Sequence, residues 1–203
     1  MARLIALLAF FCVTNVQASD EEAMSRIRAL LEAQPRIRAE FEQTKQMAEL
    51  QRPIVARGRM LVWGHTGVIW EIEEPVKNAI VLREHTTIRI DARGRRLTTR
   101  AEHDPAAARM GRVLNALLQG DTATLGQWFQ IAAQMGAQEW SITLTPRKGP
   151  MAAFLKSMQV IGDKFVRAVT LDESNGDSTR IRFLNHRDAA PLTEQERELL
   201  EVR

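Results

Sequence analysis

Apolar and polar residues alternate with a period of two through much of this chain. In one clear run, Ile37, Ala39 and Phe41 alternate with charged residues, and the pattern recurs at 140–145 and 178–184. Successive side chains of a β-strand point to opposite faces, so the pattern predicts strands with one apolar face. A sheet built from such strands must cover that face, and this requirement constrains the fold more than any other feature.

Turn residues divide the alternating segments into hairpins. Residues 64–67 (G-H-T-G) predict a four-residue loop, and Asn175-Gly176 is the pair typical of a tight hairpin turn. Pro75 and Pro146 end two of the strands. The predicted strands cover residues 37–42, 58–63, 68–73, 79–84, 86–91, 96–100, 139–145, 151–161, 164–173 and 178–184.

Other segments have helical signals. Ser19 and Glu22 form a capping box, and Asp104 followed by Pro105 is a favourable helix start. The predicted helices cover residues 19–33, 104–120, 122–129 and 193–202, the last of them polar. The order of elements predicts an α+β fold, in which one antiparallel sheet has a helical insertion in its middle. The helices are the natural cover for its apolar face.

The first 18 residues are typical of a cleavable secretory signal. Arg3 precedes an apolar run at 4–13, and a small-residue pattern ends at Ala18, which predicts cleavage there. Ten apolar residues are too few to span a bilayer, so no membrane anchor is predicted. We therefore expect a signal peptide at 1–18 and a single domain at 19–203.

Removal of this segment lowers the formal net charge from +3 to +2, which gives no reason to expect nucleic-acid binding. The single cysteine, Cys12, lies within the segment, so the mature chain has no disulfide and no zinc–thiolate site. Bulky Phe10 and Phe11 argue against the alternative that Cys12 is a lipid-attachment site.

The residues offer no recognisable catalytic constellation. The chain has no G-x-S-x-G sequence, no dinucleotide-binding glycines and no phosphate-binding loop. Residues 102–104 (E-H-D) combine acid–base residue types, but a helix start explains them better. No catalytic residue, metal ligand or cofactor is predicted.

Four arginines lie close together in the sequence: Arg93, Arg95, Arg96 and Arg100. They predict either a solvated sheet edge or a docking surface for an acidic partner or anionic lipid.

Five segments, in order, resemble the LolA family of periplasmic carriers of outer-membrane lipoproteins. They are residues 39–43 (A-E-F-E-Q), 58–62 with 68–71 (G-R-M-L-V and V-I-W-E), 117–121 (L-L-Q-G-D), 140–147 (W-S-I-T-L-T-P-R) and 175–183 (N-G-D-S-T-R-I-R-F). The resemblance implies an incomplete antiparallel β-barrel, or half-barrel, with helices covering its concave apolar face.

The resemblance also implies a function. Family members shield acyl chains in an apolar cavity, since a chain exposed to water costs about 0.8 kcal/mol per CH₂. We therefore expect a non-enzymatic, monomeric periplasmic carrier without a cofactor. It would take a lipoprotein or lipid from an inner-membrane exporter toward an outer-membrane acceptor.

The apolar strand faces and the helical insertion supply the expected cavity. The wall is expected to comprise Phe41, Met60, Val62, Val68, Trp70, Ile72, Trp140, Ile142, Leu144 and Phe183, with Met110, Leu114 and Leu118 lining a helical lid. Ordinary core packing explains each of these residues equally well.

Two departures from the family pattern leave the cargo open. Gly64 and His65 stand where typical carriers have an Arg-Pro pair tied to cargo capture, and a polar helix replaces the usual final strand. Both favour divergent relatives that carry free acyl, polyene or glycolipid molecules. One alternative is a lipid- or lipoprotein-sensing interaction module that regulates a membrane partner. An enzyme on the same fold is a third, and it would require titratable groups converging inside the cavity.

Overall fold

The structure is a computed structural model that describes residues 20–83, 85–100, 113, 116–117, 121–149, 151–189 and 191–202. Its strands form one antiparallel sheet in the order β6-β5-β4-β3-β2-β1-β11-β10-β9-β8-β7. Every pairing joins strands that are consecutive in sequence, except that β1 pairs with β11. The strands are β1 (Arg36–Gln46), β2 (Ile54–Trp63), β3 (Gly67–Glu74), β4 (Asn78–Arg83), β5 (Thr86–Ile90), β6 (Arg96–Arg100), β7 (Phe129–Met135), β8 (Trp140–Pro146), β9 (Leu155–Gly162), β10 (Val166–Glu173) and β11 (Ser178–Asp188).

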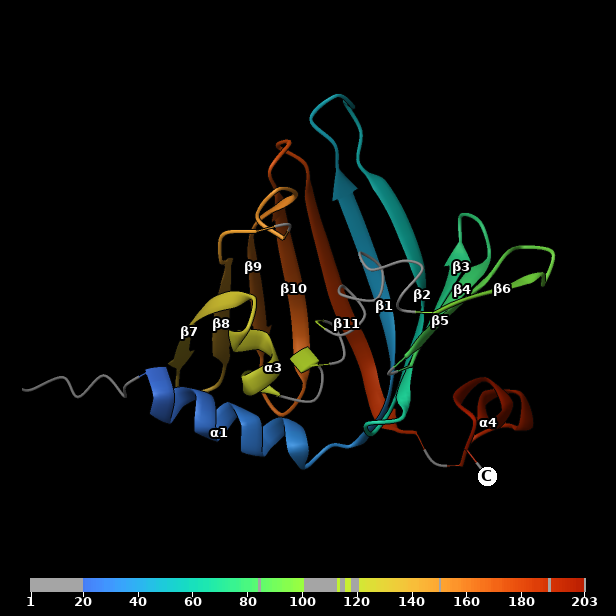
Figure 1. Cartoon of the computed structure of the whole chain (residues 1–203), viewed down its shortest axis with the longest axis horizontal. Helices are drawn as coiled ribbons and strands as arrows, with labels where there is room; N and C mark the ends of the chain where they lie inside the picture. Colours follow the sequence, from blue (N-terminus) through green and yellow to red (C-terminus); the bar gives the residue numbers. More distant parts are fainter. Residues whose placement is uncertain are drawn as a thin grey trace, which may run out of the picture.

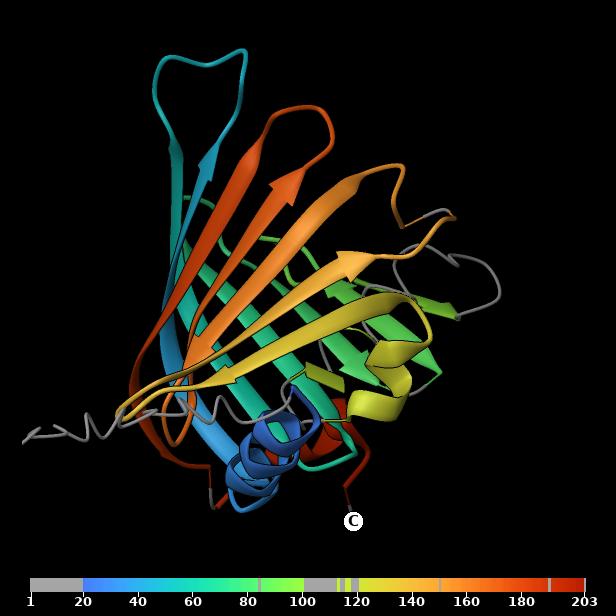
Figure 2. The same cartoon turned by 90° about the vertical axis from the view of Figure 1, so that its left-hand side faces the viewer.

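The sheet curves until its two halves face each other (Figures 1 and 2). Strands β1–β6 make one half and β7–β11 the other, and the halves join where Phe41 of β1 lies opposite Phe183 of β11. The edge strands β6 and β7 lie at opposite ends of the strand order, so the sheet does not close. The predicted half-barrel with helices is confirmed, although the protein is mostly β.

Two helices cover the concave face of this sheet. Helix α1 (Asp20–Glu32) crosses one end of β7–β10 in Figure 1 and buries Ala23, Ile27 and Leu31, which lie four residues apart on one side of the helix. Helix α3 (Thr122–Gly126) buries Leu125 in the same cluster. None of the helices in the described ranges is long and apolar enough to cross a membrane.

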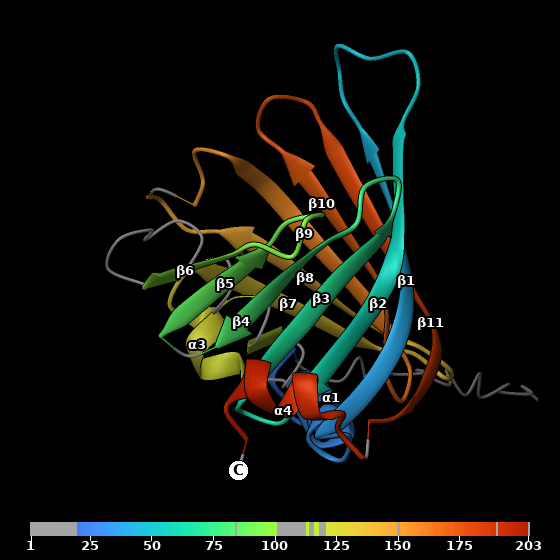
Figure 3. The same cartoon turned by 90° about the vertical axis from the view of Figure 1, so that its right-hand side faces the viewer.

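Helix α4 (Glu194–Leu200) lies on the outer surface of the sheet, over β2 and β3 in Figure 3. Its Leu199 and Leu200 belong to a second apolar cluster with Leu61, Ile69 and Val81 of the sheet. Strands β2–β4 therefore carry apolar side chains on both faces, and α4 covers the outer one. The sequence predicted this helix but gave no indication of where it packs.

Ion pairs hold α4 at three points. Arg38 of β1 donates two hydrogen bonds to the Glu196 carboxylate, one of them 2.9 Å from Nη2 to Oε2. Arg96 of β6 binds Glu198 at 2.7 Å, and Arg83 of β4 pairs with Glu201. Each pair links a sheet cation to a helix carboxylate, so the ends and middle of the helix are all fixed to the sheet.

The predicted helix at 122–129 is wrong in its second half. Helix α3 ends at Gly126, and Phe129 begins strand β7, which the sequence analysis missed entirely. In β7, the apolar residues Phe129, Ile131 and Ala133 occupy every second position, as expected for a strand. The alanines and glutamines of this segment, however, are good helix formers. Pairing with β8, in which Ile131 lies opposite Leu144, overrides this propensity.

The start of β9 also differs from the prediction. The strand begins at Leu155 rather than at residue 151, because Met151 and its neighbours form a turn. The Ala152 amide donates to the Gly149 carbonyl at 3.1 Å, and the Leu155 amide donates to the Met151 carbonyl at 3.0 Å. These local bonds use backbone groups that a strand would have paired with its neighbour.

The Arg38–Glu196 pair predicts an acid-sensitive contribution to stability. Hydrogen bonds from the Arg38 side chain lower the pKa of Glu196 from 4.5 to about 2. The stabilisation is therefore fully present above pH 4.5 and declines as the pH falls toward 2. We expect Glu196→Gln to lower the free energy of unfolding by about 1–2 kcal/mol at pH 7, as measured by urea denaturation. The difference from wild type should shrink below pH 4.5.

Glu194→Gln is the matched control, because Glu194 lies in the first turn of the same helix and forms no ion pair with any described residue. Its loss should be well under 1 kcal/mol. Equal losses for the two variants, or a loss in Glu196→Gln that does not depend on pH, would contradict the assignment.

Candidate functional site

The concave face of the half-barrel brings together every cavity-wall residue that was predicted from a strand. Phe41, Met60, Val62, Val68, Trp140, Ile142, Leu144 and Phe183 belong to one apolar cluster, and Trp70 and Ile72 pack against it. The eight cluster members are at most 4% exposed, whereas Trp70 and Ile72 are only partly buried. The three predicted lid residues, Met110, Leu114 and Leu118, lie outside the described residues, as does the E-H-D sequence at 102–104.

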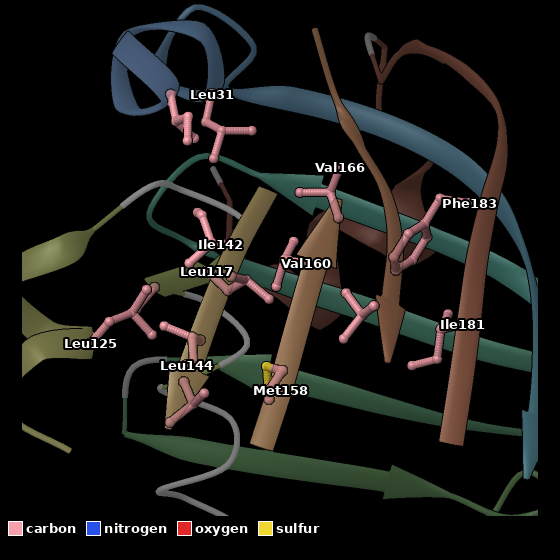
Figure 4. Packing of buried hydrophobic residues seen from close by; sticks show 14 of the residues in the cluster. Leu31, Leu117, Leu125, Ile142, Leu144, Met158, Val160, Val166, Ile181 and Phe183 are labelled. Atoms are coloured by element: carbon pink, nitrogen blue, oxygen red, sulfur yellow. The ribbon is translucent and has the colours of Figure 1, made fainter. Parts of the chain in front are cut away.

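One half of the concave face is tightly filled. Ile142 and Leu144 of β8 and Met158 and Val160 of β9 point inward and are almost fully buried, with Leu117 among them (Figure 4). Leu125 of α3 and Leu31 of α1 close the cluster from the helix side. This half is an ordinary protein core within the described residues.

Trp140 shows how closely this half is packed. Its indole lies against Gly162, where an added Cβ would come within 2.2 Å of the Trp140 ring. The indole N–H donates to the backbone carbonyl of Asp163 at 2.5 Å, which satisfies the polar group of an otherwise buried side chain. Trp140 therefore has a structural role beneath the concave surface.

The other half of the concave face is more open, and Trp70 lies at its centre. The Trp70 ring stacks on Phe41 with centroids 4.0 Å apart and meets Phe183 edge-on at 5.9 Å. Gly58 of β2 lies between Phe41 of β1 and Ile72 of β3 in the strand register. A Cβ added to Gly58 would lie 1.8 Å from the backbone oxygen of Glu71. The aromatic group therefore joins β1, β3 and β11 across the line where the two halves of the sheet meet.

An apolar strip continues from Trp70 toward the β6 edge. The strand register places Met60, Trp70, Ile80, Arg89 and Leu97 side by side on β2–β6, so these residues share the concave face. Ile80 is partly buried and Leu97 is 61% exposed. Ile80, Arg89 and Leu97 also line a pocket of roughly 480 Å³.

The sequence analysis did not include Ile80, Arg89 or Leu97 in the site. It placed each of them in a strand, but alternation alone does not say which face of a strand becomes concave. The missing signal was the pairing of each strand with its neighbour. In the structure this pairing aligns Leu97 with Arg89 and Arg89 with Ile80.

Few polar side chains are buried in the part of the chain that the structure describes. The buried polar residues among those described are Thr87, Asp177 and Thr179. Asp177 lies in the β10–β11 turn, where a hydrogen bond from the Ala48 amide lowers the pKa of its carboxyl group. The described residues contain no group of three potential metal ligands.

The arginine group near β6 is partly engaged in local contacts. Arg95 donates to Asp91 at 2.6 Å, and Arg96 binds Glu198 of α4. For Arg95 and Arg96, these contacts agree with the interpretation of the arginine group as a sheet edge. His186 is half-buried, and its ring stacks on that of Phe165 with centroids 4.7 Å apart.

The fold and the site together define an open antiparallel half-barrel with an apolar concave face and helical cover. Residues 17–198 match the family described as "Outer membrane lipoprotein carrier protein LolA-like". The chain belongs to this LolA-like family, as the sequence motifs predicted.

Comparison with individual proteins gives more distant similarities. An outer-membrane lipoprotein carrier protein of Chromohalobacter salexigens is 27% identical over 163 residues, which cover 78% of this chain and 73% of that protein. A solved LolA superfamily protein from Nitrosomonas europaea has a TM-score of 0.47 and 8% identity, over 88% of this chain and 96% of its own. The MucA/MucB complex of Pseudomonas aeruginosa has a TM-score of 0.49 and 13% identity, over 87% of this chain and 60% of that chain.

Close packing at Gly162 yields a stability prediction. Gly162→Ala would force the Trp140 ring or the Phe165 carbonyl to move, because the new Cβ would lie 2.2 Å and 2.4 Å from them. We expect the free energy of unfolding to fall by at least about 2 kcal/mol in urea denaturation. Gly126→Ala, where nothing lies within 4 Å of the added Cβ, should change it by less than about 1 kcal/mol. Similar effects from both substitutions would refute the packing argument.

Proposed function

We propose that this protein is a non-enzymatic periplasmic carrier that shields the acyl chains of a lipoprotein or lipid. The chains lie on the concave face, along the strip from Trp70 toward Leu97. The mature domain begins after Ala18, and it moves its cargo from an inner-membrane exporter toward an outer-membrane acceptor. Membership in the LolA-like carrier family supports the lipoprotein-binding and periplasmic parts of this proposal.

The observation that carries the proposal is the contrast between the two halves of the concave face. A core that serves only stability is filled throughout, as it is around Ile142 and Leu144. Trp70, Ile72 and Ile80 are instead partly buried, and Leu97 is exposed, although all four are large apolar residues on one face. Arg89 lies between Ile80 and Leu97 in this row, so the apolar surface is interrupted by one cation near its open edge. Large apolar residues left uncovered on a concave face are typical of a surface that binds an apolar ligand.

The energetics suit a reversible carrier. Transfer of a 16-carbon chain from water to an apolar surface is worth roughly 12 kcal/mol if the chain is fully covered. A half-open strip covers the chain incompletely, so the net affinity is lower and release to an acceptor remains feasible. The filled half keeps the curvature of the sheet fixed while the open half exchanges cargo.

Displacement of a fluorescent probe tests this proposal directly. Mature protein, beginning at residue 19, should bind 1-N-phenylnaphthylamine saturably, and fatty acids should displace it. Quenching or energy transfer from the tryptophans would report on proximity, since Trp70 lies within the strip. If a folded sample shows no saturable binding of the probe or of acyl ligands, the carrier proposal fails.

A matched pair of substitutions locates the binding surface. Ile80→Glu places a charge on the concave strip, and we expect it to weaken probe binding by more than about tenfold, because an acyl chain would have to desolvate the carboxylate. Leu184→Glu makes the same change on β11, at a side chain that is 44% exposed and alternates with concave Phe183. It should leave the affinity within about twofold of wild type. Equal weakening by both variants would contradict binding at the strip.

A further inference from the structure

Large apolar side chains are exposed at the end of the sheet away from α1 (Figure 1). Leu50, in the loop between β1 and β2, is 44% exposed, and Ile54 and Val55 at the start of β2 are 47% and 37% exposed. Phe154, in the loop between β8 and β9, is 42% exposed. These four residues are called the apolar rim below. They lie outside the concave strip, so the proposed cargo does not account for their exposure.

The β1–β2 tip projects past the strands on either side of it. Strand β3 ends opposite Arg57 of β2, and β11 begins opposite Gln46 of β1. The first residues of β2 therefore extend past β3, and the loop at 47–53 extends past β11, as Figures 1 and 2 show. Ile54 and Val55 are successive strand residues that point to opposite faces. The tip thus presents apolar side chains on both of its sides.

Hydrogen bonds join the loops at this end into one unit. The Ala48 amide of the β1–β2 loop donates to Asp177 Oδ1 of the β10–β11 turn at 2.9 Å. The Ser174 amide of the same turn donates to the Phe154 carbonyl of the β8–β9 loop at 2.9 Å. The β10–β11 turn therefore holds both neighbouring loops, and Leu50 and Phe154 are displayed from fixed positions.

The polar backbone groups of the tip are largely satisfied within the tip itself. The Leu50 amide donates to the Met47 carbonyl at 3.1 Å. The Gln46 side chain donates from Nε2 to the carbonyls of Met47 and Leu50, at 3.3 Å and 3.1 Å. An unpaired backbone group costs several kcal/mol in an apolar medium, so internal pairing suits a loop that enters one.

The charges at this end leave a small positive excess. The exposed cations in the described part of the two apolar loops are Arg52, Arg147 and Lys148. Glu49 opposes them with one negative charge. Lys45 binds Glu173 at 2.8 Å and Asp177 at 3.5 Å, so this group of three adds one more. Cations beside exposed apolar side chains are typical of proteins that lie on anionic lipid surfaces.

We propose that the apolar rim docks this protein on a lipid bilayer, with Leu50, Ile54 and Phe154 inserted among the lipid head groups. A protein partner would need a concave surface that fits the projecting tip, whereas a fluid bilayer adapts to any convex shape. Docking does not depend on the proposed carrier function, because the rim and the concave strip share no residue. If both hold, the rim brings the open half-barrel to a membrane that supplies or accepts cargo.

Binding to protein-free vesicles tests this proposal. Mature protein, beginning at residue 19, is mixed with vesicles of phosphatidylethanolamine and phosphatidylglycerol, and the bound fraction is measured by sedimentation as lipid is added. We expect wild type to bind, and Leu50→Glu to bind at least about tenfold more weakly, because a carboxylate at the tip would have to lose its water. Urea denaturation should give the same midpoint for both proteins, since Leu50 is exposed.

Leu184→Glu is the matched control. Leu184 is the same residue type with the same exposed fraction, 44%, but it lies on β11 opposite Glu40 of β1, within the sheet. Its vesicle affinity should stay within about twofold of wild type. Equal weakening by Leu50→Glu and Leu184→Glu would overturn docking through the rim.

A fluorescent label locates the inserted residue directly. The chain from residue 19 onward contains no cysteine, so Leu50→Cys and Leu184→Cys each provide a single attachment point for the environment-sensitive dye NBD. On addition of vesicles, emission from position 50 should shift to the blue and strengthen, and emission from position 184 should not change. Equal shifts at both positions would contradict insertion of the tip.

The outcomes separate docking from cargo binding. Leu50→Glu should keep wild-type affinity for 1-N-phenylnaphthylamine, and Ile80→Glu should keep wild-type affinity for vesicles. Loss of vesicle binding in Ile80→Glu but not in Leu50→Glu would overturn the rim and assign the lipid contact to the concave strip. If wild type binds only vesicles that contain membrane proteins, the bilayer assignment fails in favour of a protein partner. If it binds no vesicles at millimolar lipid, membrane docking fails, whatever the result with the probe.

Discussion

The structure depends on keeping water away from the apolar faces of one curved sheet. A flat sheet would need a second layer of similar size, but curvature brings apolar side chains of both halves into one cluster. Helices α1 and α3 complete that cover with few residues, chiefly Ala23, Ile27, Leu31 and Leu125. Helix α4 meets the same need on the outer face of β2–β4, where Leu199 and Leu200 cover Leu61 and Ile69.

This arrangement divides the concave face into regions with different roles. Around β8 and β9 the side chains are packed to the density of a core, and even the small Gly162 is necessary for the position of Trp140. Around β3–β6 large apolar residues are left partly buried. Packing that is rigid on one side and incomplete on the other suits the proposed exchange of an apolar ligand by a protein that keeps its shape.

Much of the fold was predictable because the alternation of residue types is a local property. The β2–β3 hairpin was predicted from its four-residue loop, and the β10–β11 hairpin from its Asn-Gly pair. Strand β7 was missed because Ala and Gln favour a helix locally, and only pairing with β8 decides against it. The outward position of α4 was likewise not predictable, since its partners Leu61 and Ile69 lie far away in sequence.

The candidate site was predictable to a similar extent. Strand residues such as Phe41 and Trp70 were correctly expected to share one surface, because the motifs that contain them lie on consecutive strands. Their differing exposure and the extension of the strip to Ile80 and Leu97 depend on register, which a single sequence does not specify.

The pairing of β1 with β11 has a consequence for the order of folding. All other strand pairs join neighbours in sequence and can form as soon as each hairpin is available, whereas this pair waits for residues 178–188. Contacts between distant segments are formed slowly because a long loop must be closed. The contact of Phe183 with Trp70 therefore belongs to the last stage of folding, and a chain that stops before β11 would retain two separate meanders with no concave surface between them.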